Sequence, residues 1–245
     1  MSDDALRILH VSDTHGAIAF ERIEQTFGDD FDVFCHTGDW LPDPPMRSQA
    51  DLICYQMEWL RHEGPALAAY LRGRPFVACL GNHDALSEAW VERELGTLGV
   101  QATLPGSRPN PRVSVAGGTF LGCRYVPFMG GAFEGECTAP ELVERVLHLS
   151  ARWYPDDILL AHCPPQGALA GPPDRAWGNA PLADSLRSSF GDLAPRLILC
   201  GHIHECPGSE RIGQTTVINS ARSVSRIRWK KRVGVLEYQT CPLRR

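Results

Sequence analysis

The sequence contains no apolar run long enough to cross a membrane, and its first residues, MSDDALRILHVSD, place two acids rather than a cationic segment before a short apolar run. These absences predict a cytoplasmic protein with neither a signal peptide nor a membrane partner. Internal repeats and low-complexity linkers are also absent. With 43% hydrophobic residues, 22% charged residues and a net charge of -5, the chain has the composition of a folded protein, and we expect one domain over residues 1–245.

The nine cysteines lack any CxxC spacing, and their number is odd. This pattern argues against a disulfide framework and against a thiolate-ligated zinc site. Several cysteines lie in apolar runs such as DVFCHT, FVACL and LILC, where a reduced thiol behaves as a small buried hydrophobic side chain. We therefore expect free thiols.

Short apolar runs bounded by Gly, Pro or Asp recur along the chain and predict buried strands. They are LRILHVS, FDVFCHT, PFVACLG, FLGCRYV, DILLAHC, RLILCG, TTVINS and VGVLEY. Apolar residues at three- and four-residue spacing predict helices over residues 46–72, 87–98 and 140–152. The alternation of strands and helices indicates an α/β fold. Beyond residue 204 only strand-like runs occur, which favours a mixed sheet or two stacked sheets.

Residue types that bind metal ions are concentrated in five short blocks, DTHG, TGDW, GNHD, AHCPP and GHIH, placed at the ends of predicted strands. Loops at the carboxyl ends of strands converge in open α/β sheets, so these segments can meet at one point. Carboxylate, amide and imidazole groups without a thiolate suit Mn, Fe, Zn or Mg, and there are more of them than one ion needs. The candidate ligands are Asp13, His15, Asp39, Asn82, His162, His202 and His204.

Two cations held about 3.5–4 Å apart need a shared anion, and Asp39, which stands alone in its block, is the candidate bridge. Asp13 and His15 are separated by one residue, so in an extended segment both side chains would point to one side and could share an ion. His204 has the same relation to His202. Neutral imidazoles would keep the ions electrophilic, so the expected nucleophile is a hydroxide that bridges the metals.

Taken in order, the blocks D-x-H, G-D, G-N-H-D, H and G-H-x-H resemble those of the calcineurin-like metallophosphoesterase superfamily, from residue 13 to residue 204. The resemblance implies a four-layer α/β/β/α sandwich of two mixed β-sheets flanked by helices. It also implies a phosphate-ester hydrolase with two divalent metal ions, of which Mn or Fe is favoured. It assigns one ion to Asp13, His15 and His204 and the other to Asn82, His162 and His202, with Asp39 between them.

The same resemblance implies a role for His83, which lies between Asn82 and Asp84. We expect His83 to protonate the departing alkoxide as a general acid and Asp84 to orient it. The alternative is that either residue only organises the turn. Outside these motifs, four histidines are expected to be structural or to lie at the surface, and Cys163 is not expected to be a nucleophile because the metal-activated water makes one redundant. The four are His10, His36, His62 and His148.

The block GDWLPDPP lacks the Arg that clamps phosphate in the protein phosphatases of the superfamily. Residues 201–205 read GHIHE, and VINSA follows at residues 217–221. Both resemble the compact branch of small phosphodiesterases. We therefore expect a phosphodiesterase acting on a small phosphate ester, with a phosphomonoesterase as the alternative within the superfamily.

Two other classes are weighed. The segment ARSVSRIRWKKR carries six cations over residues 222–232 and could grip a nucleic acid, as in a nuclease. Because runs of charge usually only face water, this partner is not favoured. A non-catalytic protein-binding scaffold on the same fold would be expected to have lost metal ligands, whereas this chain keeps all seven.

Overall fold

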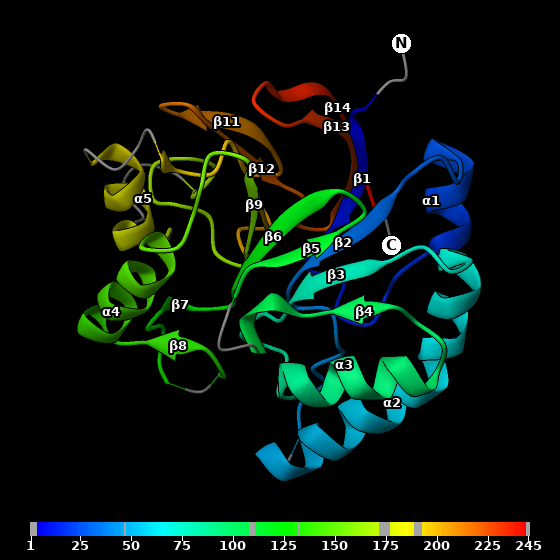
Figure 1. The fold of residues 1–245 in the computed structure, drawn as a ribbon. Helices are drawn as coiled ribbons and strands as arrows, with labels where there is room; N and C mark the ends of the chain where they lie inside the picture. The colour runs from blue at the N-terminus through cyan, green and yellow to red at the C-terminus, as the bar shows by residue number, and fades with distance from the viewer. Residues whose placement is uncertain are drawn as a thin grey trace.

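The computed structural model describes residues 4–46, 48–107, 111–131, 133–171, 177–188 and 193–243. Two six-stranded mixed sheets lie against each other, with helices on both outer sides (Figure 1). The helices packed on the first sheet are α1 (Phe20–Phe27), α2 (Gln49–Leu71) and α3 (Glu88–Thr97), and those on the second are α4 (Ala139–Ser150) and α5 (Ala180–Arg187). The expected four-layer α/β/β/α sandwich is confirmed.

The first sheet has the strand order β14-β13-β1-β2-β3-β4. Its strands are β1 (Leu6–Val11), β2 (Val33–Thr37), β3 (Phe76–Cys79), β4 (Ala102–Thr103), β13 (Ser223–Lys230) and β14 (Gly234–Pro242). Strands β1 to β4 are parallel, and β13 and β14 add an antiparallel edge. The carboxyl ends of β1, β2 and β3 therefore lie at one edge.

The second sheet has the order β11-β12-β10-β9-β6-β5. Its strands are β5 (Val113–Val115), β6 (Gly118–Cys123), β9 (Asp157–Ala161), β10 (Leu197–Cys200), β11 (Gly208–Ile212) and β12 (Thr215–Asn219). The four central strands are parallel, and β5 and β11 are antiparallel edges. A 3₁₀ turn (Pro105–Ser107) and the short pair β7 (Val126–Pro127) and β8 (Glu136–Cys137) lie outside the two sheets.

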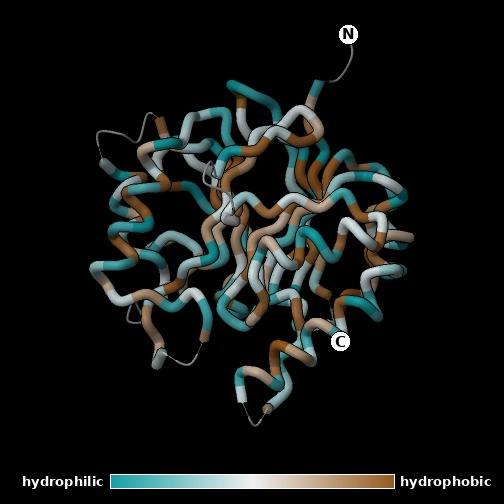
Figure 2. Tube along the Cα trace, turned by 60° about the horizontal axis from the view of Figure 1, so that its bottom comes forward, coloured by the Kyte–Doolittle hydropathy of each residue, from teal (hydrophilic) through white to brown (hydrophobic). Residues whose placement is uncertain are grey.

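The side chains of β1 point alternately to two different cores, which explains why such strands appear in the sequence as continuous apolar runs. Leu9 and Val11 join the core beneath α1, α2 and α3, whereas Leu6 and Ile8 join the core between the sheets. Because both faces of such a strand are buried, neither set of alternating positions needs to be polar. In Figure 2 the hydrophobic colour accordingly follows the inner strands.

The helices expected over residues 46–72, 87–98 and 140–152 are confirmed as α2, α3 and α4. Helix α2 begins after Ser48, whose side chain accepts a hydrogen bond from the backbone N–H of Asp51, as an N-cap does. Helices α1 and α5 were not predicted. Each has eight residues, fewer than the roughly 11–18 residues over which a helical period is usually recognised.

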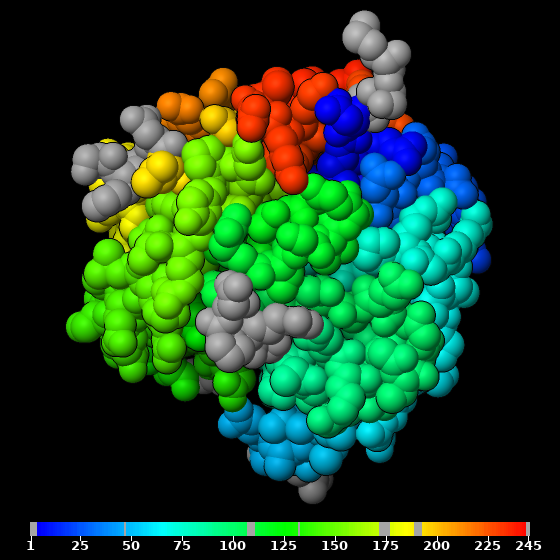
Figure 3. Space-filling view, viewed as in Figure 1, coloured from blue at the N-terminus to red at the C-terminus, as the bar shows by residue number. Residues whose placement is uncertain are grey.

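The chain after residue 204 forms only strands in the described region, as expected. Strand β13 pairs with β1, so the last strands complete the sheet that the first strand begins. Figure 3 shows these segments, red and blue, packed side by side. All nine cysteines are free thiols, which confirms that prediction. No helix within the described ranges is long and apolar enough to cross a membrane.

Candidate metal centre

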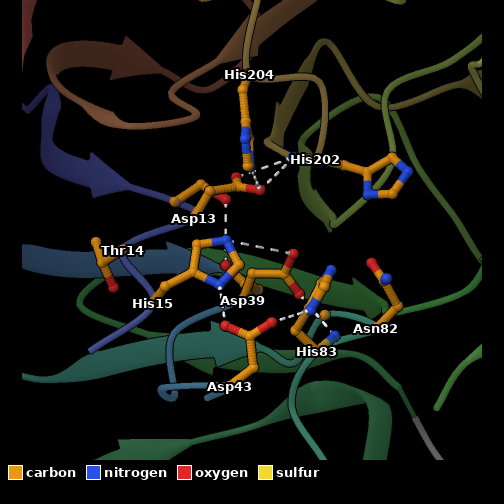
Figure 4. Close-up of polar contacts among 12 residues, drawn as sticks. Asp13, Thr14, His15, Asp39, Asp43, Asn82, His83, His202 and His204 are labelled. Atoms are coloured by element: carbon orange, nitrogen blue, oxygen red, sulfur yellow. Dashed lines mark hydrogen bonds and ion pairs between the residues drawn. The ribbon is translucent and has the colours of Figure 1, made fainter. Parts of the chain in front are cut away.

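The candidate ligands gather where strands of both sheets end (Figure 4). Loops that follow β1, β2 and β3 of the first sheet face loops that follow β9 and β10 of the second. The structure thus brings together segments that are up to about 190 residues apart in the sequence, as the hydrogen bond between Asp13 and His204 shows. The ligand loops carry, in chain order, Asp13, His15, Asp39, Asn82, His162, His202 and His204.

Four of the candidate ligands have a left-handed backbone. The φ angles are 55° for Asp13, 44° for His15, 51° for Asp39 and 66° for His202. The expected extended segment over Asp13 and His15 is therefore wrong, because the chain turns sharply at both residues. Non-glycine residues in this region store strain that the surrounding structure must hold, and such strain concentrates at functional sites.

Glycines precede three of the ligands for a steric reason. A Cβ atom at Gly38 would collide with Nδ1 of His162, and one at Gly81 would collide with Oδ1 of Asp39. At Gly201 it would meet Oδ2 of Asp13. The G-D, G-N and G-H pairs of the sequence therefore let the backbone of one loop lie directly against a ligand from another loop.

One group of ligand atoms comes from Asp13, His15 and His204, which lie within 4.8 Å of one another. Oδ1 of Asp13 is 3.0 Å from Nε2 of His204. The backbone N–H of His202 donates to the same carboxylate at 2.9 Å and 3.0 Å. The main chain thus orients the Asp13 carboxylate toward the group.

A second group comes from Asp39, His162 and His202, and Asn82 joins it through Oδ1, which is 3.0 Å from Nε2 of His162. The Nδ1–H of His162 donates to the carbonyl oxygen of Thr37 at 2.7 Å, which leaves Nε2 directed at the group. Asp39 reaches both groups: Oδ1 is 3.3 Å from Nε2 of His162, and Oδ2 is 4.0 Å from Nε2 of His15.

The donor chemistry fits two divalent cations. Asp13 and Asp39 are each only 2% exposed, and the candidate groups offer carboxylate oxygens and imidazole nitrogens as ligand atoms. Burial opposes ionisation of Asp39, but the neighbouring His162 lowers the pKa of the carboxyl group below its ordinary value. Burial also favours neutral His162, yet Asp39 raises the pKa of this imidazole to about 9. These ligand atoms could instead hold metal ions, which would balance the same negative charge.

Asp43 is a site residue that the sequence did not reveal. Its Oδ1 is 3.1 Å from Nδ1 of His15, and its Oδ2 contacts Nδ1 of His83 (Figure 4). The two imidazole rings lie edge to face with centroids 5.2 Å apart. The sequence signal was present, since Asp43 lies in GDWLPDPP four residues after Asp39, but a proline-rich loop predicts no direction for a side chain.

Asp84 occupies a different place from the one expected. Its carboxylate accepts hydrogen bonds from the backbone N–H groups of Leu41 and Gly81, both at 2.8 Å. The carboxylate that contacts the His83 imidazole is that of Asp43, not that of Asp84. Asp84 instead ties the loop after β2 to the loop after β3, in line with the turn-organising alternative.

The remaining histidines are placed as expected. His10 hydrogen-bonds Thr37 and Ser220 inside the protein, and His36 hydrogen-bonds Thr14. Burial lowers the pKa of both imidazoles to about 3, so they are neutral. The two other histidines, His62 and His148, are exposed.

Cys163 is buried beside His162. Burial raises the pKa of its thiol far above the ordinary value. A thiol that stays protonated is a poor nucleophile, which agrees with the expectation that Cys163 does not attack substrate.

A cleft of about 260 Å³ opens onto the ligands. Its described lining contains no Arg or Lys and consists of Asp39, His83, Met129, Trp177, His202, Ile203, His204 and Glu205. A larger hollow of about 520 Å³ between α4 and α5 is lined mainly by apolar residues and contains none of the candidate ligands. Size alone therefore does not identify the functional site here.

The basic segment over residues 222–232 lies mostly on β13, whose alternate positions point away from the core between the sheets. Arg228 pairs with Glu237 at 3.1 Å, and Lys230 pairs with Asp4 at 2.5 Å. Part of the positive charge is thus neutralised within the protein.

Residues 6–206 match the family model of the calcineurin-like phosphoesterases. The chain belongs to this family. It is 28% identical over 233 residues to UPF0046 protein K07C11.7 of Caenorhabditis elegans, covering 89% of this chain and 70% of that protein. A solved crystal structure is similar over 98% of this chain and 100% of its own, with a TM-score of 0.70 and 13% identity, and shows the same fold. The E. coli phosphoesterase YfcE matches 96% of this chain and 98% of its own, at 15% identity and a TM-score of 0.37.

Family membership indicates a hydrolase that acts on phosphate esters. The groups of His and Asp side chains at the strand ends could hold the metal ions that such an enzyme uses.

Proposed function

We propose that the protein is a metal-dependent phosphodiesterase of the compact branch with a GHIHE motif. The observation that carries the proposal is the convergence of six ligand residues on two adjacent groups, with Asn82 in contact with His162 and Asp39 within 4.0 Å of both groups. One ion would be held by Asp13, His15 and His204, and the other by Asn82, His162 and His202, with Asp39 shared. Bound ions, Mn or Fe in preference to Zn or Mg, would polarise the phosphoryl group and acidify the attacking water.

His83 supplies the proton in this proposal. Asp43 binds its Nδ1, so the second ring nitrogen is free to face a substrate in the cleft that His83 lines. From there the imidazole can protonate the oxygen of the leaving alcohol as the bond to phosphorus breaks. The backbone N–H of His83 also donates to Oδ1 of Asp39 at 3.0 Å. This hydrogen bond fixes the position of the proposed acid relative to the ligand that the two ions would share.

The charge of the cleft favours a diester over a monoester. Its described lining has no Arg or Lys, and Glu205 places a carboxylate at its edge. A phosphate diester carries one negative charge, whereas a monoester carries close to two at neutral pH and is commonly bound through Arg. Met129, Trp177 and Ile203 offer apolar surface for the groups that a diester carries on both sides.

Metal analysis of the purified protein tests this proposal together with a substrate screen. The screen compares bis-p-nitrophenyl phosphate with p-nitrophenyl phosphate in the presence of Mn, Fe, Zn, Co or Mg. We expect about two bound ions per chain, activity that chelators remove, and a preference for the diester. Activity without bound transition ions and insensitive to chelators would refute the proposal.

Two further expectations accompany the proposed function, one about the number of domains and one about a nuclease. Strands from both ends of the chain share one sheet, which supports a single domain over residues 1–245. The cations of the basic segment are partly paired, which leaves a nuclease as the less favoured alternative. A nuclease would bind DNA or RNA with a steep dependence on salt that weakens when Arg226 to Arg232 are neutralised.

A further inference from the structure

Gln56 is a polar exception on the buried face of α2. The other buried residues of this helix, which form its core-facing stripe, are Leu60, Gly64, Leu67, Tyr70 and Leu71. Gln56 is 0% exposed. Burying an amide side chain lowers the stability of a protein unless its hydrogen bonds are made. The hydrogen-bond partners of Gln56 therefore indicate what the side chain does.

The partners of Gln56 belong to the two loops that carry the proposed acid and its aspartate. Its Nε2 donates to the carbonyl oxygens of Pro42, at 3.1 Å, and His83, at 2.9 Å. Its Oε1 accepts from the backbone N–H of Ala85 at 2.8 Å. Pro42 directly precedes Asp43, whose carboxylate contacts the His83 imidazole. One amide therefore holds the main chain at both ends of the Asp43–His83 contact.

We propose that Gln56 is a positioning residue that aligns the Asp43–His83 pair with the cleft. The inference rests on the proposed general-acid role of His83. Gln56 is suited to this task because α2 is 23 residues long and its neighbouring stripe is packed into the core. The helix is a rigid support, whereas residues 42–43 and 83–85 of the two loops belong to no helix or strand, and Asp84 ties these loops at other residues, Leu41 and Gly81. Small displacements of a catalytic group cost much of its rate contribution.

The decisive variant is Gln56→Met, which keeps the length of the side chain and removes all three hydrogen bonds. The measurement is kcat and KM for two diesters, bis-p-nitrophenyl phosphate and a diester with an alkyl leaving group. The alkoxide needs a proton to depart, whereas nitrophenolate does not. We expect kcat to fall on the order of tenfold to a hundredfold for the alkyl diester. KM, bound metal and turnover of the nitrophenyl diester should change little.

Leu60→Ala is the matched control, because it removes a buried side chain one turn further along the same stripe. Leu60 belongs to the hydrophobic core beneath α1, α2 and α3. Unlike Gln56, it makes no side-chain hydrogen bond to the loops that carry Asp43 and His83. This control should lower Tm while leaving the ratio of the two kcat values at the wild-type level. If Gln56→Met does not fold, Gln56→Asn, which keeps the amide on a shorter side chain, provides the same comparison.

His83→Ala, measured in parallel, separates failure of the inference from failure of the proposed function. A selective loss with the alkyl diester in both His83→Ala and Gln56→Met supports the inference. A selective loss in His83→Ala alone, or an equal loss with both substrates in Gln56→Met, overturns the positioning role and leaves the proposed function standing. If His83→Ala shows no selective loss, the acid role falls and the inference falls with it. Wild-type protein that hydrolyses neither diester would overturn the proposed function itself.

Discussion

The two ends of the first sheet both gather charged residues, but they balance the charge in different ways. At the amino end of β1 and β2, Arg7 binds Asp32 with an Nη2–Oδ1 distance of 2.6 Å, and Lys230 pairs with Asp4. These groups are partly exposed to solvent. Asp32 and Asp4 are thus paired with cations that the protein itself supplies.

At the carboxyl end the carboxylates of Asp13 and Asp39 are buried and face imidazoles instead. Imidazole can be neutral, so it does not guarantee a positive charge at neutral pH. The backbone at both aspartates is left-handed, whereas none of the four residues in the ion pairs named above has a positive φ. This difference indicates that one end of the sheet only stabilises the fold, whereas the other is arranged to receive cations.

Asp39→Ala should have the largest effect, because it removes the ligand that reaches both groups. We expect loss of both ions and turnover at the background rate of hydrolysis. Metal stoichiometry of the dialysed variant, measured beside wild type, tests this expectation. Retention of one tightly bound ion would show that Asp39 serves one group alone.

His83→Ala should have the next largest effect, and on rate rather than on metal content. A general acid accelerates a reaction roughly 10²- to 10⁴-fold, so kcat should fall by a factor in this range with a substrate that has a poor leaving group. Both ions should remain bound. Full kcat on an alkyl diester would exclude His83 as the acid.

Asn82→Ala and His204→Ala should each weaken one ion more than the other. Asn82 lies in the buried group and His204, whose side chain is 25% exposed, in the more open one. Losing one ligand oxygen or nitrogen leaves the opposite group complete. Metal titration of the two variants should reveal different sites with reduced affinity, and an equal loss of both ions in either variant would contradict the assignment.

Glu205→Gln should have a modest effect on specificity. Removing this carboxylate from the edge of the cleft should raise the rate with monoester relative to diester by roughly fivefold, the equivalent of about 1 kcal/mol for two charges near each other in water. The ratio of the two kcat/KM values is the measurement. An unchanged ratio would mean that Glu205 does not sense the charge of the substrate.

Asp32→Asn tests the opposite end and should have the smallest effect. Hydrogen bonding from Arg7 lowers the pKa of Asp32, so its stabilising contribution is present above the unfolded value near 3.8 and disappears as the pH falls through the lower folded value. At pH 7 we expect the free energy of unfolding to fall by about 1 kcal/mol or less, with no change in activity. Denaturant titrations of the variant and wild type should differ at pH 7 and converge in strong acid.

The elements that the sequence predicted are those with a strong local pattern. Leu6, Ile8, Leu9 and Val11 form a short apolar run of the kind that predicts a doubly buried strand, and α2 is long, with buried residues that recur at three- and four-residue spacing. Helices α1 and α5 have only eight residues each, fewer than the roughly 11–18 over which such a pattern is usually recognised. The extended segment predicted for Asp13 and His15 failed because strain at a functional turn follows from packing, which a local pattern does not record.

The sequence by itself indicated an α/β fold and placed each candidate ligand just after a predicted strand, because short apolar runs and the blocks that follow them are local properties. The four-layer arrangement was expected only from the family resemblance, because the pairing and stacking of strands depend on contacts between distant segments. Only the tertiary structure decided that Asp43, rather than Asp84, contacts His83, and that Gln56 joins their two loops. Both depend on where side chains from separate loops and a helix point after packing. No spacing along the sequence encodes that direction.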